Sequence, residues 1–326
     1  MNKLNVFRTL LLLLFSLLVS CEEESDVIDP KQVGLWKYWD TSNGLTSNEI
    51  RAFKQDHNGI IWVGTYGGGV CRYDNGNWSS IQKRNGLLND TVFSIEEDLF
   101  GDIWIGTGYG INIISDGRIF KIDTIFYPDE FTLSLFSDSR GRMWIGTNWG
   151  IILYDYSKFY YAYFIDDGLY PIYSITEDNS GQIWFSTPGG AVGYSDKDES
   201  FHFIQMDDGL YSNNVHCIMQ DSWGMLWFGH VEAERITRWN GNNFEFINLF
   251  NGYAYPNVFS MVEDHNRNIW FTTKNSGIIC YDGVVPRTIG IKDGLKDYDI
   301  RCSMVDNEGS LWFGSDSLGI QIYIPE

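Results

Sequence analysis

Short apolar stretches with a tryptophan at the second position recur along the chain and are typical of buried strands. They read IWVGT, IWIGT, MWIGT, IWFST, LWFGH, IWFTT and LWFGS. Their β-branched and aromatic residues suit a strand that is covered on both faces. Alternating apolar and polar residues precede and follow the stretches, as in VFSIEE, GVCRYD and NWSSIQ. The pattern therefore predicts repeated units of four strands.

The tryptophans of these stretches recur at a nearly constant interval of 42, 40, 40, 43, 43 and 42 residues. They are Trp62, Trp104, Trp144, Trp184, Trp227, Trp270 and Trp312. A period near 40 residues is typical of propeller blades, which are four-stranded sheets arranged radially around a channel. The sequence therefore predicts an all-β fold, a seven-bladed β-propeller over residues 34–326.

An aspartate stands six positions before each tryptophan, in the motif D-x-x-G-x-x-W. Arg267 replaces the glycine in the sixth copy. Aspartate favours the first position of a tight turn, and glycine permits the left-handed conformation that such turns need. We therefore interpret the aspartates as turn formers rather than metal ligands or catalytic acids. They are Asp56, Asp98, Asp138, Asp178, Asp221, Asp264 and Asp306.

A small residue stands four positions before each aspartate, which suits innermost strands because they crowd near the axis. These residues are Ala52, Ser94, Ser134, Ser174, Cys217, Ser260 and Cys302. The last unit ends after its third strand at GIQIYIPE, whereas the chain begins with an additional strand at LWKYW. We expect the N-terminal strand to complete the last blade and so to close the ring.

The N-terminus has the features of a targeting segment. Lys3 and Arg8 precede an apolar run that is too short to span a membrane, and Ser20 before Cys21 resembles the lipobox of bacterial lipoproteins. We interpret residues 1–20 as a lipoprotein signal peptide and Cys21 as a lipidated residue. The lipid is expected to anchor the chain in the bacterial cell envelope, at the outer membrane, on its periplasmic side or at the cell surface. The alternative is an ordinary signal peptide with an incidental cysteine. Residues 21–33 are acidic and are expected to form a solvated tether.

The chain carries 23 Lys and Arg against 43 Asp and Glu, a net charge of −20. This charge disfavours nucleic acid as a partner, because phosphate backbones are bound through basic side chains. Besides Cys21, the chain has four cysteines, which we expect to be buried thiols without a disulfide or a metal. No cofactor is predicted. The four are Cys71, Cys217, Cys280 and Cys302.

The composite pattern NGL…D-x-x-G-x-I-W-[VI]-G-T-x-x-G resembles the two-component regulator propeller repeat over residues 34–326. That family forms the extracytoplasmic sensor part of hybrid signalling proteins in Gram-negative bacteria. The resemblance implies a β-propeller that detects a ligand. This sequence shows no membrane helix after the repeats and no kinase, receiver or helix-turn-helix region, so a stand-alone lipoprotein is expected.

In such a ring, the connectors between blades and the loops between second and third strands open on one face, opposite the D-x-x-G corners. Aromatic residues are frequent in these loops, whereas Trp223 and Phe100 are the only Trp, Tyr or Phe residues within the D-x-x-G corners. Aromatic rings with a polar group suit sugars, so we expect a carbohydrate or another small ligand at the channel mouth. The candidates are Tyr66, Tyr109, Trp149, Tyr170, Tyr211, Tyr253, Tyr255 and Tyr298.

The fifth unit departs from the repeat, with HVEAER where the first unit has TYGG. We expect His230, Glu232, Glu234 and Arg235 to lie together on the ligand face, so His230 and Arg235 join the candidates. Sequence divergence in one repeat, without a functional role, explains this departure equally well.

An enzyme is the less favoured interpretation. Propeller lyases and lactonases use a histidine or a metal, and only His216 and His230 are suitably located, without a nucleophile or metal-ligand spacing beside them. A sialidase is excluded, because its aspartate precedes tryptophan by five residues and its arginine triad is not evident, although Arg51, Arg235 and Arg301 can approach the axis. We therefore predict a binding module. The alternatives are a scaffold for an envelope protein partner and a lyase or lactonase.

Overall fold

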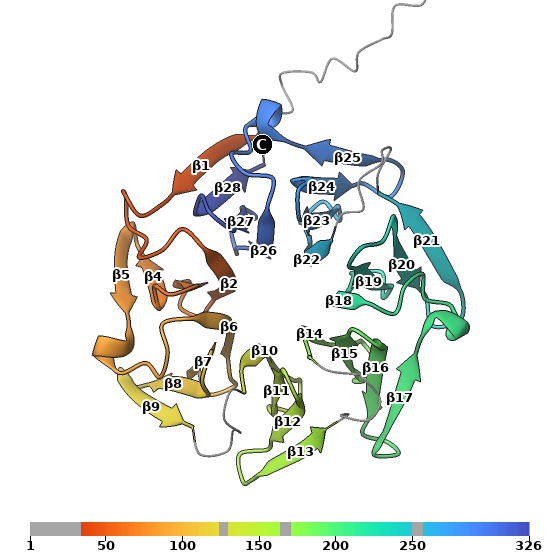
Figure 1. Ribbon diagram of the computed structural model, residues 1–326, viewed down its shortest axis with the longest axis horizontal. Coiled ribbons are helices and arrows are strands. Elements are labelled where there is room, and N and C mark those ends of the chain that lie inside the picture. Colours follow the sequence, from red (N-terminus) through yellow and green to blue (C-terminus); the bar gives the residue numbers. More distant parts are fainter. Residues whose placement is uncertain (1–33, 124–129, 164–170, 250–256, 326) are drawn as a thin grey trace, which may run out of the picture. The chain divides into compact units, whose positions relative to one another are not determined.

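The computed structural model describes residues 34–123, 130–163, 171–249 and 257–325. They form 28 strands in seven four-stranded antiparallel sheets that surround a central axis (Figure 1). The predicted all-β, seven-bladed propeller with four-stranded blades is thereby confirmed. The predicted signal peptide, Cys21 and the tether lie outside the described residues.

The strands of each blade follow one another from the axis outward. The innermost strands are β2 (Ile50–Gln55), β6 (Val92–Glu97), β10 (Thr132–Ser137), β14 (Ser174–Glu177), β18 (Val215–Gln220), β22 (Val258–Glu263) and β26 (Ile300–Val305). The second strands are β3 (Ile61–Thr65), β7 (Ile103–Thr107), β11 (Met143–Thr147), β15 (Ile183–Thr187), β19 (Leu226–His230), β23 (Ile269–Thr273) and β27 (Leu311–Ser315). The third strands are β4 (Val70–Asp74), β8 (Ile111–Ser115), β12 (Gly150–Tyr154), β16 (Gly190–Ser195), β20 (Arg235–Trp239), β24 (Ile278–Tyr281) and β28 (Ile320–Ile324). The outermost strands are β5 (Asn77–Ile81), β9 (Arg118–Ile122), β13 (Phe159–Tyr163), β17 (Ser200–Ile204), β21 (Phe244–Asn248), β25 (Pro286–Ile289) and β1 (Leu35–Trp39).

The outermost strand of the seventh blade is β1, from the N-terminal end of the described chain. It pairs antiparallel with β28 over five residue pairs, from Leu35 opposite Ile324 to Trp39 opposite Ile320. Further hydrogen bonds join the seventh blade to the first. The backbone N–H of Gly319 donates to Asn48 O at 2.9 Å, and the backbone N–H of Asn307 donates to Gln55 Oε1 at 2.7 Å.

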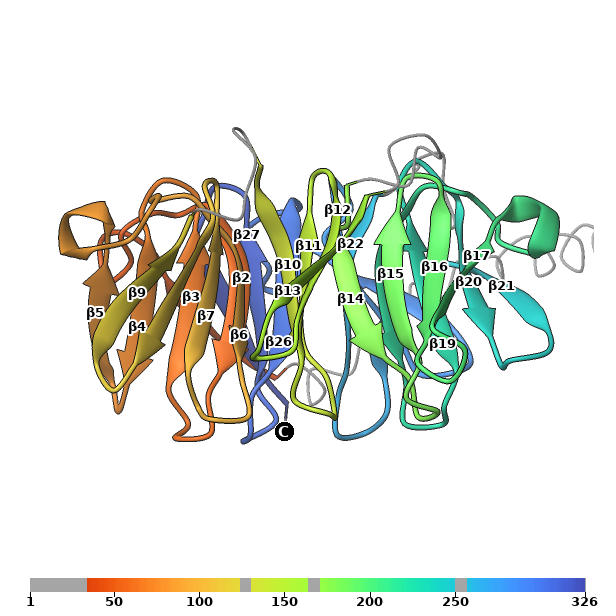
Figure 2. The same cartoon turned by 90° about the horizontal axis from the view of Figure 1, so that it is seen from below.

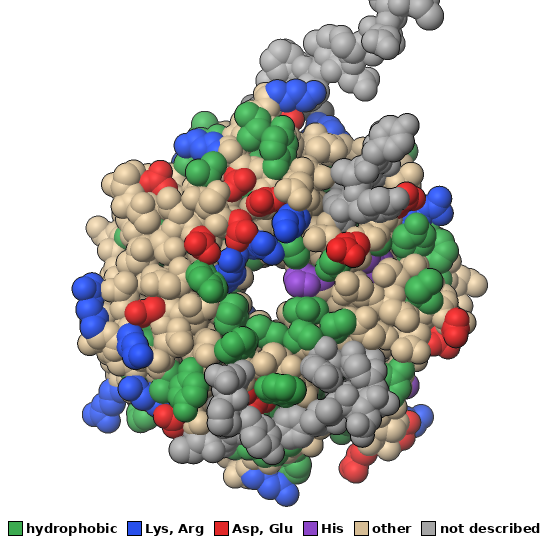
Figure 3. All heavy atoms as spheres, viewed as in Figure 1, with side chains coloured by type: hydrophobic (Ala, Val, Ile, Leu, Met, Phe, Trp, Pro, Cys, Tyr) green, Lys and Arg blue, Asp and Glu red, His purple; other side chains and the backbone are tan. Residues whose placement is uncertain are grey.

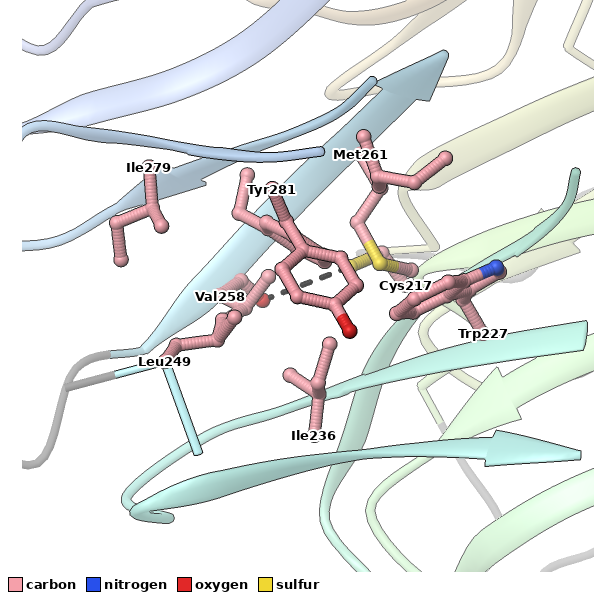
Figure 4. Packing of buried hydrophobic residues seen from close by; sticks show 10 residues of the cluster. Cys217, Trp227, Ile236, Leu249, Val258, Met261, Ile279 and Tyr281 are labelled. Atoms are coloured by element: carbon pink, nitrogen blue, oxygen red, sulfur yellow. Dashed lines mark hydrogen bonds between the residues drawn. The ribbon is translucent and has the colours of Figure 1, made fainter. Parts of the chain in front are cut away.

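The hydrophobic core lies within and between the blades. Every residue of all seven second strands is buried, as expected for strands covered on both faces. Figure 4 shows one such cluster between the fifth and sixth blades, in which Cys217 lies beside Trp227 and its Sγ–H donates to Val258 O at 3.6 Å. All four described cysteines are free and buried, as predicted.

The aspartates form the corners, as predicted, and they also bind the tryptophan of the same motif. In Asp221, Oδ1 accepts the backbone N–H groups of Trp223 and Met225 at 3.0 and 2.8 Å, while Oδ2 accepts the Trp227 indole N–H at 2.7 Å. The indole bond recurs in all seven blades at 2.7–2.9 Å. Arg267, at the glycine position of the sixth corner, adopts the left-handed conformation with φ 67°.

The small residues of the innermost strands lie where adjacent blades approach closely. Ser94 faces Gly106 across the β6–β7 pair, and a Cβ on Gly106 would lie 2.2 Å from Ser94 Oγ and 2.6 Å from Thr132 Cγ2 of the next blade. The leucines of the connectors between blades are buried and fill the remaining space there. These are Leu45, Leu87, Leu210 and Leu295.

The strand directions divide the loops between two opposite faces, which are the upper and lower sides in Figure 2. We call the first the connector face. It carries the connectors between blades and the loops between second and third strands. We call the second the corner face. It carries the D-x-x-G corners and the turns between third and outermost strands.

Candidate functional site

The central channel is a cavity of about 450 Å³ between the innermost strands. Figure 3 shows basic, histidine and hydrophobic side chains around its opening on the connector face. One half-buried side chain from each blade, just before the small residue of the innermost strand, lines this channel. We call the seven residues the channel ring: Arg51, Phe93, Leu133, Tyr173, His216, Phe259 and Arg301.

Two arginines of the channel ring share one carboxylate where the seventh blade meets the first. Arg51 Nη1 donates to Asp316 Oδ1 at 2.5 Å, and Arg301 Nη2 donates to Asp316 Oδ2 at 2.8 Å. Arg51 Nη2 also donates to Glu49 Oε2 at 3.3 Å. Burial opposes the charge of Asp316, but the two arginines hold the pKa of its carboxyl below the usual value. This charge-balanced cluster presents both donors and acceptors beside the channel.

The opposite part of the channel ring is aromatic. The His216 ring centroid lies 4.4 Å from that of Tyr173 and 5.0 Å from that of Phe259, and the Arg301 guanidinium lies 4.4 Å from the Phe259 centroid. Burial among these side chains, with a smaller effect of Arg301, lowers the pKa of His216 to about 4. The imidazole is therefore neutral at pH 7 and can accept or donate a hydrogen bond.

The described aromatic candidates lie on the connector face, but none of them lines the channel. Tyr66, Tyr109, Trp149 and Tyr298 are 37–48% exposed. Tyr66 contacts the channel ring, because the Arg51 guanidinium lies 5.3 Å from its ring centroid. The Tyr298 ring packs against the backbone at Gly290, beyond the end of β25. Three further candidates fall outside the described residues: Tyr170, Tyr253 and Tyr255.

Tyr211 and Arg235 lie over the outer half of the fifth blade. The Arg235 guanidinium is 5.8 Å from the Tyr211 ring centroid, and the same ring meets Phe246 of β21 edge to face at 5.5 Å. Arg235 is exposed and does not line the channel, whereas Arg51 and Arg301 approach the axis as predicted.

The prediction that His230 presents its side chain on the ligand face is wrong. His230 is 1% exposed, and its Nε2 is 2.8 Å from Thr237 Oγ1. It is the last residue of β19, where the first blade has Thr65, whose hydroxyl donates to Gly69 O in the following loop. Burial lowers the pKa of His230 to about 4. Glu232 and Glu234 are exposed in the loop that follows.

The channel ring as a set was not predicted from the sequence, although its members share one repeat position. The sequence nevertheless contained a signal for this position. Each residue of the channel ring directly precedes one of the small residues that were predicted to lie near the axis. The side chains at this position range from arginine to leucine, so no common residue type identifies it.

The described residues hold no group of three His, Cys, Asp or Glu side chains that could bind a metal ion. Nor do they include a helix with the length and apolar character that crossing a bilayer requires.

Four segments of the chain match the family model described as the two component regulator propeller. They are residues 44–67, 127–149, 168–189 and 212–232, which fall in the first, third, fourth and fifth blades. The predicted resemblance is therefore confirmed. A search of curated proteins finds no match.

Solved structures share the fold. The extracellular domain assigned to a hybrid two component system of B. thetaiotaomicron is 24% identical, with a TM-score of 0.77 over 90% of this chain. A second such domain from that organism is 21% identical, with a TM-score of 0.73 over 90%. This chain covers only 41% and 40% of those two domains. The catalytically inactive virginiamycin B lyase from Staphylococcus aureus with quinupristin is 15% identical, with a TM-score of 0.72 over 89% of this chain and 99% of the lyase.

Proposed function

Because the chain carries two-component regulator propeller repeats, we propose that it is an extracytoplasmic ligand-binding and sensing module of the bacterial cell envelope. A lipid on Cys21 anchors it. It binds a carbohydrate or a related small polymer without catalysis. The ligand enters the channel from the connector face, beneath the predicted aromatic candidates.

The two-sided wall of the channel supports this proposal most directly. The aromatic part offers flat faces to the C–H groups of a sugar ring, while the cluster of Arg51, Asp316 and Arg301 offers donors and acceptors to hydroxyl groups. Together with Glu49, which Arg51 also binds, the cluster is charge-balanced, and this favours a neutral ligand over a strongly charged one. The cavity of about 450 Å³ is within the usual range of small-molecule sites.

A glycan array with the purified, lipid-free chain tests the proposal, followed by calorimetry with the glycan that it identifies. Phe259→Leu in the channel wall and Tyr66→Ala at its mouth should each weaken binding about fivefold, because a stacking contact contributes on the order of 1 kcal/mol. Asn58→Ala on the corner face is the control and should leave the Kd unchanged. Equal losses in all three variants, or no glycan bound, would contradict the proposed site.

The anchor is tested separately. Cys21→Ser should release a soluble protein or leave an uncleaved precursor, because the modified thiol is then missing. Membrane fractionation and electrophoretic mobility measure the change. A variant that fractionates and migrates like the original chain would exclude lipidation at Cys21.

A propeller lyase is the second candidate, on the likeness to virginiamycin B lyase and on His216 in the channel wall. A histidine with a pKa of about 4 is a weak base at neutral pH, which argues against it. Incubation with quinupristin should therefore leave the compound intact. A product that accumulates with the original chain and disappears with His216→Ala would favour the lyase instead.

A further inference from the structure

The most exposed large apolar side chains of the described residues all lie on the corner face. Six of them are 63–79% exposed, whereas no other exceeds 55%. Three belong to the D-x-x-G corners of the second and fifth blades, two to the turn between β24 and β25, and one is the first residue of β1. We call them the apolar tips: Leu35, Leu99, Phe100, Trp223, Val284 and Val285.

Neighbouring side chains hold two of the apolar tips in place. The Arg267 guanidinium lies 4.4 Å from the Trp223 ring centroid, and the Phe100 ring meets Tyr156 edge to face at 5.0 Å. Both aromatic rings nevertheless remain more than 70% exposed. They therefore project from the corner face rather than fold back onto it.

The propeller begins at this same face. Leu35 pairs with Ile324 at the end of β28, and the strand then runs toward the connector face. Thirteen residues, 22–34, separate Leu35 from Cys21. A solvated tether of that length, as expected from the sequence, would have a root-mean-square span of roughly 20 Å. A lipid on Cys21 would keep the corner face near the bilayer at high effective concentration, so weak contacts there would suffice.

We propose that the corner face rests on the lipid surface to which the chain is anchored, with the apolar tips at the membrane–water interface. This inference rests on the proposed anchoring through Cys21. Tryptophan and phenylalanine side chains favour that interface. The net charge of −20 disfavours an anionic surface, so the contact suits zwitterionic lipid. The connector face and the channel mouth then point away from the membrane, toward their ligand.

The experiment uses the lipidated full chain in vesicles of phosphatidylcholine and phosphatidylethanolamine. A polarity-sensitive fluorophore is attached in separate variants at Val284→Cys and Leu99→Cys, on well-separated blades of the corner face. Met206→Cys, 55% exposed on the connector face, is the matched control. The four described native thiols are buried, and the lipid blocks Cys21. Both corner labels should shift to the blue and be quenched by brominated lipid, whereas the label at position 206 should do neither.

The other possible results each contradict a different part of the proposal. A shift at position 206, or none at the two corner positions, overturns the proposed orientation while the anchor stands. Release of the labelled chain from vesicles under conditions that retain lipoproteins overturns both the anchor and this inference. A shift that needs no vesicles and grows with protein concentration assigns the apolar tips to a second copy of the chain. Replacing part of the lipid by phosphatidylglycerol should weaken the shifts, and stronger shifts would contradict the preference for zwitterionic lipid.

Discussion

A single carboxylate in each corner stabilises two parts of its blade. Its Oδ1 organises the turn, while Oδ2 binds the indole of a buried tryptophan, as Asp221 does for Trp227. The sequence predicted the turn but not the indole bond, because a spacing of six residues does not show that the chain folds back within the motif. For His230, by contrast, the prediction from the sequence was wrong. It aligns with the five buried threonines and the buried serine that end the other second strands, so it belongs to the interior of the blade rather than to its surface.

The burial of His230 should make the stability of the protein depend on pH. Its pKa is about 4 in the folded chain against an ordinary value of 6.5, so the unfolded chain takes up the proton first. The contribution of the neutral imidazole is complete above pH 6.5 and is lost as the pH falls toward 4, by about 3 kcal/mol. His230→Gln cannot ionise, so its free energy of unfolding should fall less between pH 6.5 and 4. Urea unfolding at several pH values measures the difference, and parallel curves would contradict it.

At the scale of the strand, the close approach of neighbouring blades limits side-chain size. Gly106→Ala should lower the free energy of unfolding by about 2 kcal/mol, because the new methyl group would meet Ser94 and Thr132. Gly108→Ala, two residues further on, is the control, since the nearest atom to its Cβ would be 3.4 Å away. Chemical denaturation should therefore separate the two variants. Equal stabilities would show that the blades can move apart at no cost.

The strands could be predicted because every blade repeats the same buried pattern, whereas the candidate site could be predicted only in part. The connector face was identified correctly for Tyr66 and Tyr109, and Arg51 and Arg301 reach the axis as expected. The aromatic part of the channel ring, with Phe259, was missed. Its side chains vary from blade to blade, and what brings them together is the closed ring rather than any local spacing.

At the scale of the whole molecule, the ring depends on a strand contributed from the opposite end of the chain. Deleting residues 34–40 should lower the free energy of unfolding by several kcal/mol, because β28 would lose its paired neighbour and Tyr323 the cover of Trp36. Deleting residues 22–28 of the tether is the control and should have little effect. Thermal melting compares the two truncated chains. Equal melting temperatures would mean that the ring does not depend on β1.

The same strand decides how the propeller would carry a mechanical load. Leu35 is the first residue of β1, and the strand runs from the corner face toward the connector face. A pull on Leu35 directed away from the corner face acts along the strand, so it loads all five residue pairs with β28 in shear instead of opening them one after another. With the anchor proposed at Cys21, a force from flowing medium would reach the ring through Leu35. The β1–β28 pairing would then resist that force in shear, so β1 would not be peeled away from β28.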